Sequence, residues 1–235
     1  MNRLSSYPNP KLQGWRLPKD VQSPSIYYCF WRRLLQMWLT TICKVRVFNR
    51  HYEPVGGGVV YICNHQSFLD PILMAYALQR PVNFMARESL FRWPPFRRLI
   101  ESVHTFPVRR GTADVAALKE SMRRLKANGQ LAMFAEGTRT SDGRLGPFLP
   151  GAAVLCQRAA QWTVPVLIDG AFEAWPRTQM LPRPGNIVVQ YAPPISQAEA
   201  KKLEPKAFVE KVRSTLIEIQ ADVRKRVGRP ALKYV

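Results

Sequence analysis

The stretch VVYICNHQSFLDPILMAYALQ, residues 59–79, decides the fold class. Its first five residues are apolar, NHQSFLD (64–70) is largely polar, and PILMAYALQ is again apolar, which predicts a buried strand, a loop and a helix. In such a unit, catalytic side chains collect in the loop after the strand, where backbone N–H groups of the next helix also point. The loop therefore places His65 and Asp70 where chemistry is expected.

Short apolar runs and helical patterns continue to alternate along the chain. Further strands are expected at residues 82–86, 104–108, 131–135, 164–168 and 187–191. Alternation of this kind is typical of parallel strands joined by crossover helices. The predicted fold class is therefore α/β, with a mixed, largely parallel sheet flanked by helices.

Three helices of this pattern can be recognised in the sequence. One is expected over 112–128, with Thr112 as its cap and Asn128-Gly129 as its stop, and another over 151–161. The C-terminal segment repeats apolar residues at helical spacing, so it is predicted to pack across the domain as the last helix. Its apolar stripe consists of Phe208, Val212, Leu216, Ile219 and Val223.

Composition limits the partners that the protein can have. At 235 residues the chain is long enough for one sizeable core, and 35 Lys and Arg residues against 16 Asp and Glu residues give a formal charge of +19. Such a surface attracts nucleic acid, anionic lipid or a phosphorylated substrate. The four cysteines are widely spaced, which suits reduced core thiols better than disulfides or a zinc site. A reducing, cytoplasmic-side location without a metal site is expected.

The N-terminal part of the chain is expected to be a tail followed by a membrane-association segment. Residues 1–24 are polar and lack the apolar region of a secretory signal, so a flexible tail is predicted. Within residues 25–50, the longest uncharged run is the ten residues 34–43, against about 20 needed to span a bilayer. An N-terminal interfacial helix over 27–47 is predicted. A core helix that covers the sheet is the alternative.

His65 and Asp70 can form a catalytic pair only if the chain bends between them. Five residues apart on one helix, their side chains would diverge by about 140°. Two capping schemes permit the bend: Asp70 as N-cap with Pro71 as the first helical residue, or Ser67 as N-cap with Asp70 closing a capping box. The first is favoured. A carboxylate that accepts the imidazole N–H makes the other nitrogen a general base for an alcohol, whereas the alternative is that Asp70 only caps the helix.

FAEGTRT, residues 134–140, is a second polar segment that follows a predicted strand. Gly137 permits close backbone approach, Thr138 offers a hydroxyl and an amide, and the planar guanidinium of Arg139 suits a phosphate dianion. Glu136 would repel a phosphate, so it is expected to orient Arg139 or to bind a substrate hydroxyl. Taken alone, a simple turn explains the segment equally well.

FPVRRG, residues 106–111, is the third such segment. Arg109 and Arg110 follow a predicted strand and are expected to reach the same edge of the sheet. Three strand ends would then carry a base, a guanidinium and further arginine. This combination indicates a site for an alcohol that bears a phosphate.

Five segments together resemble the lysophosphatidic acid acyltransferase family, within the phospholipid and glycerol acyltransferase superfamily. They are the H-x4-D motif in NHQSFLD, ARESLF at 86–91, FPVRRG, FAEGTR and VPV at 164–166. The resemblance covers roughly residues 55–191 and implies a glycerol-3-phosphate acyltransferase-like fold, with an acyltransferase domain over 51–235. It also implies transfer of a fatty acyl group from an acyl thioester to the free hydroxyl of a lysophospholipid, foremost lysophosphatidic acid to phosphatidic acid.

The resemblance implies roles for individual residues. His65 would deprotonate the hydroxyl, Asp70 would support it, and the oxygen would attack the thioester without a covalent acyl-enzyme. The residues implied in substrate binding are Asn64, Arg110, Glu136, Gly137, Thr138 and Arg139. Those implied in shaping the apolar side of the site, near the acyl chain, are Val164, Pro165 and Val166.

Three positions depart from the family pattern. Arg109 stands where the family often has an acidic residue, and it adds positive charge beside the acceptor site. Ala135 stands where proline is usual, and VPVLIDG (164–170) is a shortened form of the fourth motif. Only the first departure bears on the identity of the acceptor headgroup.

The implied partners are a lysophospholipid, an acyl thioester (acyl-CoA or acyl-ACP) and an anionic membrane surface, with acyl carrier protein as a further partner. No bound cofactor, metal or nucleic acid is expected, and the location would be peripheral or monotopic on the cytoplasmic face of the cell membrane. LFRWPPFRRL (90–99) is either a second interfacial patch or a segment with Phe91 and Phe96 in the core. The alternatives are another lysolipid, amino-acid lipid or glycolipid acceptor, and a non-enzymatic protein that binds lipid or RNA.

Overall fold

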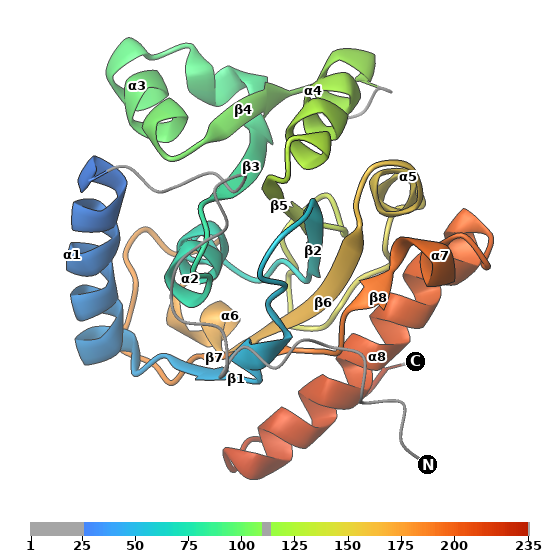
Figure 1. The fold of residues 1–235 in the computed structure, drawn as a ribbon. Coiled ribbons are helices and arrows are strands. Elements are labelled where there is room, and N and C mark those ends of the chain that lie inside the picture. Colours follow the sequence, from blue (N-terminus) through green and yellow to red (C-terminus); the bar gives the residue numbers. More distant parts are fainter. Residues whose placement is uncertain (1–25, 110–113, 235) are drawn as a thin grey trace.

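The computed structural model describes residues 26–109 and 114–234, in which eight strands form one mixed sheet (Figure 1). The order across the sheet is β1-β7-β6-β2-β5-β3-β4, and β8 pairs with β6. The strands are β1 (Arg46–Phe48), β2 (Val59–Cys63), β3 (Val82–Arg87), β4 (Thr105–Val108), β5 (Gln130–Phe134), β6 (Trp162–Asp169), β7 (Val188–Tyr191) and β8 (Ile195–Ser196). The helices are α1 (Ile26–Cys43), α2 (Asp70–Ala77), α3 (Pro94–Ser102), α4 (Val115–Lys126), α5 (Gly151–Arg158), α6 (Ala171–Ala174), α7 (Gln197–Ala200) and α8 (Pro205–Arg226), with 3-10 turns η1 (Arg50–Tyr52) and η2 (Glu88–Phe91).

Five strands of this sheet run in the same direction. Strand β2 pairs in parallel with β5 and β6, and β3 pairs in parallel with β4 and β5. Strand β7 is antiparallel to β6, and β1 is parallel to β7. The predicted mixed, largely parallel sheet is confirmed. The carboxyl ends of β6, β2, β5, β3 and β4 therefore lie along one edge, where α/β sheets place their ligands.

Two hydrophobic clusters cover the two faces of the sheet. In β2, Tyr61 and Cys63 pack with α1, α2 and α6, whereas Val60 and Ile62 pack with α4, α5, α7 and α8. Figure 1 shows α1, α2 and α6 on one side of the strands and α5, α7 and α8 on the other. Because both faces are covered, all five residues of β2 are buried, which explains its continuous apolar sequence.

The strands and the last helix largely follow the sequence pattern. Each predicted strand is present, with limits that differ by at most two residues. Helix α8 buries Phe208, Val212, Leu216 and Val223, as its spacing predicts, and Ile219 is partly buried against the same cluster.

Several helix limits differ from the sequence prediction: α5 ends at Arg158 and not at residue 161, and two other differences have a local cause. Helix α1 ends at Cys43 because Lys44 adopts a left-handed conformation, with φ of 40°, so Val47 lies in β1 rather than in the helix. Helix α4 is capped by Asp114, whose side chain accepts a hydrogen bond from the backbone N–H of Ala117. The cap predicted at Thr112 lies outside the described residues.

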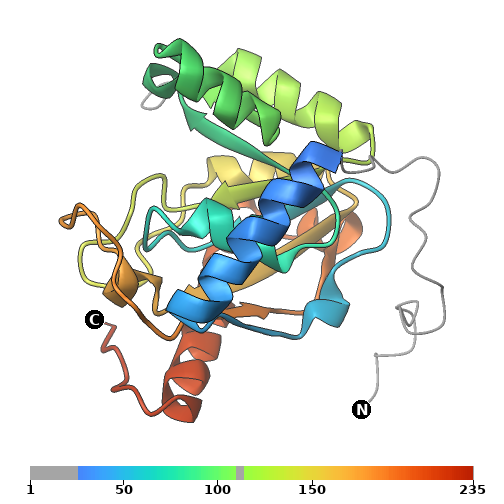
Figure 2. The same ribbon diagram turned by 90° about the vertical axis from the view of Figure 1, so that its left-hand side faces the viewer.

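Helix α1 divides into a packed and an exposed side. Leu39 and Cys43 are fully buried against the cluster that contains α2. Large apolar side chains on its other side are exposed: Ile26, Phe30, Leu34, Met37 and Ile42. Figure 2 shows α1 lying obliquely across the outside of the molecule. Among the described helices, none is long and apolar enough to cross a bilayer.

The segment around α3 is largely exposed. Leu90, Trp93 and Leu99 are exposed, and Phe91 and Phe96 are half-buried and belong to neither core cluster. The interpretation of Phe91 and Phe96 as core residues is therefore wrong.

Candidate active site

The loop after β2 turns sharply into α2 at Asp70. Leu69 is the N-cap, Asp70 is the first helical residue and Pro71 follows it, so the favoured scheme with Asp70 as N-cap is wrong. Half of the alternative capping box is present, because Asp70 Oδ2 accepts the backbone N–H of Ser67 at 2.7 Å. Ser67 Oγ instead accepts the N–H of Leu69, at 3.1 Å. Asp70 thereby folds the loop back over the helix start.

This turn brings the histidine and the aspartate into contact. His65 Nδ1 lies 2.6 Å from Asp70 Oδ2, and the same oxygen accepts the backbone N–H of Gln66 at 2.6 Å. Because Oδ2 already accepts two backbone N–H groups, it acts as an acceptor, and Nδ1 carries the imidazole proton. His65 Nε2 then holds the lone pair that can take a proton. The ring is steadied by stacking on Phe134, with centroids 4.3 Å apart.

Asp70 is held in an environment that disfavours its charge. The residue is fully buried, and Oδ1 has no hydrogen-bond partner among the residues that the structure describes. Burial raises the pKa of the Asp70 carboxyl, and the hydrogen bond from His65 offsets part of that effect. A carboxylate of this kind gains from a positive charge on the adjacent imidazole.

Glu136 fastens the catalytic loop to its neighbours. Its Oε1 accepts the backbone N–H of His65 at 2.7 Å, and its Oε2 accepts that of Gly146 at 3.0 Å. Burial raises its pKa to about 7, against the lowering effect of these two hydrogen bonds. Both carboxylate oxygens of Glu136 thus bind backbone N–H groups, and its expected role toward Arg139 or a substrate hydroxyl stays a prediction. Glu136 holds the loop of His65 against the segment of Gly146.

A second hydrogen bond joins the loop after β5 to His65. The backbone N–H of Thr140 donates to the carbonyl oxygen of His65 at 2.8 Å. Arg139, the preceding residue, places its guanidinium over the ring of Phe68, with Cζ 3.5 Å from the centroid. Stacking uses the face of the guanidinium, whereas its N–H groups lie in its plane and are directed outward from it. The base and a cation are thus held on adjoining loops.

The rest of the EGTR segment supports this arrangement. Gly137 has a φ of +69°, and a Cβ atom there would lie 2.8 Å from Leu149 Cδ1, so the turn requires glycine. Thr138 is exposed at the turn. The predicted roles of Gly137 and Thr138 in substrate binding stay predictions.

The side-chain carboxamide of Asn64 is hydrogen-bonded to the backbone of β6. Its Nδ2 donates to the carbonyl oxygen of Ile168 at 2.8 Å, and its Oδ1 accepts the N–H of Ile168 at 2.8 Å. Both ends of the carboxamide are therefore engaged with β6. Asn64 joins the ends of two neighbouring strands, and this geometry does not support the substrate contact implied by the resemblance.

The VPV segment lies in the core of the sheet, and Arg109 of the FPVRRG segment lies at the surface. Val164 and Val166 are fully buried in the core of β6, so they present no surface to an acyl chain in this structure. Pro165 is buried in the same strand. Arg109 is exposed and pairs with Glu88, with Nε 3.2 Å from Oε2. Arg110 lies outside the described residues.

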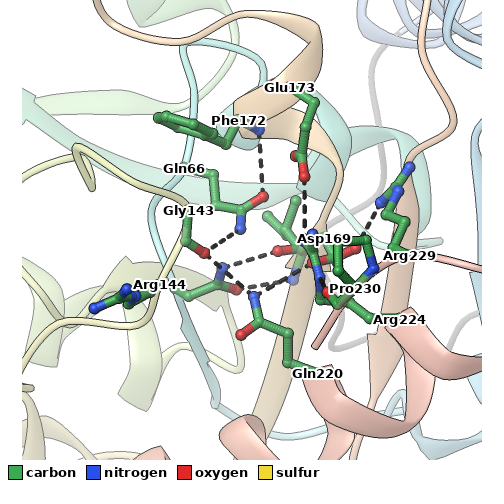
Figure 3. A network of polar contacts seen from close by, with 12 residues as sticks. Gln66, Gly143, Arg144, Asp169, Phe172, Glu173, Gln220, Arg224, Arg229 and Pro230 are labelled. Atoms are coloured by element: carbon green, nitrogen blue, oxygen red, sulfur yellow. Dashed lines mark hydrogen bonds and ion pairs between the residues drawn. The ribbon is translucent and has the colours of Figure 1, made fainter. Parts of the chain in front are cut away.

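A buried polar network behind the loop was not anticipated from the sequence (Figure 3). Asp169, at the end of β6, pairs with Arg224 at 3.0 Å and with Arg229 at 2.6 Å. Gln220 Nε2 donates to Asp169 Oδ1 and to the carbonyl oxygen of Gly143, each at 3.3 Å. The one sequence signal was that Asp169 follows an apolar strand, as His65 does.

The same network reaches the residue next to the base. Gln66 Nε2 donates to the carbonyl oxygen of Gly143 at 2.9 Å, and Gln66 Oε1 accepts the N–H of Phe172 at 3.3 Å. Helix α8 also binds the segment that meets Glu136, because Arg213 Nε donates to the carbonyl oxygen of Gly146 at 2.8 Å. The loop of His65 is therefore held from behind by α8 and its C-terminal extension.

Comparison with known proteins gives consistent matches. The family model described as Acyltransferase matches residues 44–169. A 1-acyl-sn-glycerol-3-phosphate acyltransferase from Cocos nucifera is 28% identical over 162 residues, which are 68% of this chain and 53% of that protein. One from Bacillus subtilis is 26% identical over 180 residues, 76% of this chain and 87% of that protein. The chain thus spans about half the length of the Cocos nucifera relative.

A solved structure shares the fold. The crystal structure of the 1-acyl-sn-glycerophosphate (LPA) acyltransferase, PlsC, from Thermotoga maritima matches with a TM-score of 0.68 at 21% sequence identity. The match covers 83% of this chain and 81% of that one. The mixed sheet with its flanking helices is therefore shared with this structure.

Proposed function

This chain belongs to the acyltransferase family, and from that premise we propose that it moves a fatty acyl group from an acyl thioester to the free hydroxyl of lysophosphatidic acid, which yields phosphatidic acid. The observation that carries the proposal is the contact of 2.6 Å between His65 and Asp70, on a loop bonded to the segment that bears Arg139. The names of the relatives support the same acceptor.

The proposed reaction uses His65 as general base. Its Nε2 takes the proton of the acceptor hydroxyl while the oxygen attacks the thioester carbonyl carbon. The tetrahedral intermediate then collapses, the C–S bond breaks, and the leaving thiolate takes the proton back from the imidazolium. Asp70 stabilises the positive ring in between, and positioned base catalysis of this kind contributes about 10²–10⁴-fold.

Arginine is proposed to bind the acceptor phosphate. Arg139 is the described candidate, and the preceding residue, Thr138, is exposed. Arg110 is assigned the same role by its place in the FPVRRG motif. Charge-assisted hydrogen bonds of this type contribute about 1.5–3 kcal/mol each.

Association with an anionic membrane surface is proposed through α1. Its exposed apolar side chains and the overall charge of +19 suit a helix in the interface of a bilayer with acidic lipids. The exposed residues around α3, Leu90, Trp93 and Leu99, are proposed as a second patch. A peripheral or monotopic location on the cytoplasmic face follows, with acyl-CoA or acyl-ACP as the donor.

An acceptor screen at fixed acyl-CoA tests the proposal. Purified protein is incubated with lysophosphatidic acid, with lysolipids of other headgroups and with phosphate-free monoacylglycerol, and the acylated products are measured. We expect phosphatidic acid as the fastest product. Faster acylation of a lysolipid with another headgroup would identify that lysolipid as the acceptor and leave the proposed reaction unchanged. No transfer to any acceptor would favour a non-enzymatic binding protein.

A further inference from the structure

The loop between α6 and β7 carries an exposed apolar pair at its tip. Met180 is 85% exposed and Leu181 is 72% exposed, which makes them two of the most exposed large hydrophobic residues in the described part of the chain. Arg177 and Arg183 flank them and are exposed as well. Residues 174–186 contain no Asp or Glu. Adjacent apolar side chains between arginines suit the interface of an anionic bilayer.

The base of this loop is fixed to the end of α1. The N–H of Gly185 donates to the carbonyl oxygen of Ile42 at 3.3 Å, and that of Ile187 donates to Cys43 at 3.2 Å. Figure 1 draws the loop near the C-terminal end of α1, and Figure 2 shows it extending outward from there. The loop that carries Met180 and Leu181 is therefore anchored to α1, the helix with exposed apolar side chains.

The other side of the loop reaches the catalytic segment. Trp175 Nε1 donates to the carbonyl oxygen of Gln179 at 3.1 Å, and the Trp175 ring lies 5.3 Å from that of Phe68. Phe68 is 47% exposed and is covered by the guanidinium of Arg139. Ser67 Oγ also donates to the carbonyl oxygen of Trp175, at 2.7 Å. Trp175 thus contacts Phe68 on the loop of His65 and the backbone of Gln179, the residue before Met180.

We propose that Met180 and Leu181 insert into an anionic bilayer and that Phe68 and Trp175 receive the acyl chain of a lysophospholipid drawn from it. The proposal rests on the proposed function. The phosphate would meet Arg139 while the chain follows the two rings toward the bilayer. This order matches an acceptor that is amphipathic, with its charge at one end and its free hydroxyl between the phosphate and the chain.

The test uses Met180→Asp and Leu181→Asp, each compared with Val115→Asp. Val115 is 57% exposed on α4, on the opposite face of the sheet from α1, so it offers the same change of an exposed apolar side chain to a charge. Binding to vesicles of phosphatidylcholine and phosphatidylglycerol is measured by co-sedimentation. We expect each tip variant to weaken binding about tenfold, since an apolar side chain leaves the interface, and Val115→Asp to bind as wild type does.

Activity supplies the second readout. Lysophosphatidic acid embedded in vesicles is compared with a short-chain form that is monomeric in water. We expect the tip variants to lose about tenfold on the embedded acceptor, and to keep the wild-type rate on the monomeric one.

Unchanged vesicle binding, or equal losses on both acceptors, would overturn the proposal and favour a protein partner at the tip. If wild-type protein acylates neither acceptor, the proposed function fails, and with it the roles of Phe68 and Trp175. The measurement of vesicle binding then still decides whether Met180 and Leu181 insert into the bilayer.

Discussion

Two fully buried aspartates, Asp70 after β2 and Asp169 at the end of the neighbouring strand β6, have different surroundings. Asp169 pairs each of its oxygens with a guanidinium, from Arg224 and Arg229. The hydrogen-bond donors of Asp70 all contact Oδ2, and Oδ1 has no hydrogen-bond partner among the described residues. The compensated carboxylate can only hold the fold together, whereas the other one gains further from a positive charge on His65. In the proposed mechanism, the buried Asp169 stabilises the fold, whereas the buried Asp70 supports catalysis.

The largest expected effect comes from Asp70→Asn. The amide cannot neutralise an imidazolium, so we expect kcat for acyl transfer to fall about 10²–10⁴-fold. The free energy of unfolding should change much less than the barrier to catalysis. Steady-state kinetics and urea unfolding of the same preparation measure both. If the variant keeps the wild-type kcat, Asp70 does not contribute to catalysis and the proposed difference between Asp70 and Asp169 is contradicted.

Asp169→Asn should show the opposite pattern. Two arginines lose their buried counter-charge, so we expect the free energy of unfolding to fall by about 3–5 kcal/mol. Urea unfolding followed by circular dichroism measures the change. Glu173→Gln is the matched control, because Glu173 is an exposed partner of Arg224 and its loss should change stability by less than about 1 kcal/mol. Equal effects of the two substitutions would contradict the structural role of Asp169.

Arg139→Ala tests the proposed binding of the acceptor phosphate next to His65 and Asp70. The loss of one charge-assisted contact of about 1.5–3 kcal/mol should lower kcat/KM for phosphate-bearing acceptors by about 10–150-fold, and should spare phosphate-free acceptors. Arg109→Ala is the control, since Arg109 is exposed and pairs with Glu88. An equal loss on acceptors with and without phosphate would argue against Arg139 as the phosphate ligand.

Glu136→Gln tests a third carboxyl by its pH dependence. Burial raises the pKa of Glu136 from 4.5 to about 7, so the folded protein binds this proton more tightly than the unfolded chain does. Its contribution therefore stabilises the fold below about pH 4.5 and is lost as pH rises toward 7. We expect the wild type to lose about 2 kcal/mol more than Glu136→Gln across this window, after allowance for partial exposure. Unfolding curves with the same pH slope would contradict the raised pKa.

Much of the fold is predictable because its signals are local. The strand, loop and helix of residues 59–77 lie within one short stretch, and the contact of His65 with Asp70 spans five residues. Strands β1 and β8 are three and two residues long, too short for a pattern of their own. Strand β1 forms only by pairing with β7, which lies more than a hundred residues later in the sequence.

The supporting contacts of the site could not be predicted because they depend on distant or backbone groups. Asp169 meets arginines 55 and 60 residues further along the chain. Glu136 accepts backbone N–H groups, which every residue except proline has, so its sequence context could not identify them. The burial of Val164 and Val166 could not be predicted for another reason: the sequence of an apolar run is the same whether the run lines a site or lies in the core.

The role of His65 as general base is tested most directly by one measurement. Acyl transfer from acyl-CoA to lysophosphatidic acid is compared between wild type and His65→Ala, at equal folded fraction and equal vesicle binding. We predict that His65→Ala loses about 10²–10⁴-fold in kcat while its unfolding and its binding to vesicles stay as in wild type. Transfer at the wild-type rate by His65→Ala would contradict the proposed mechanism.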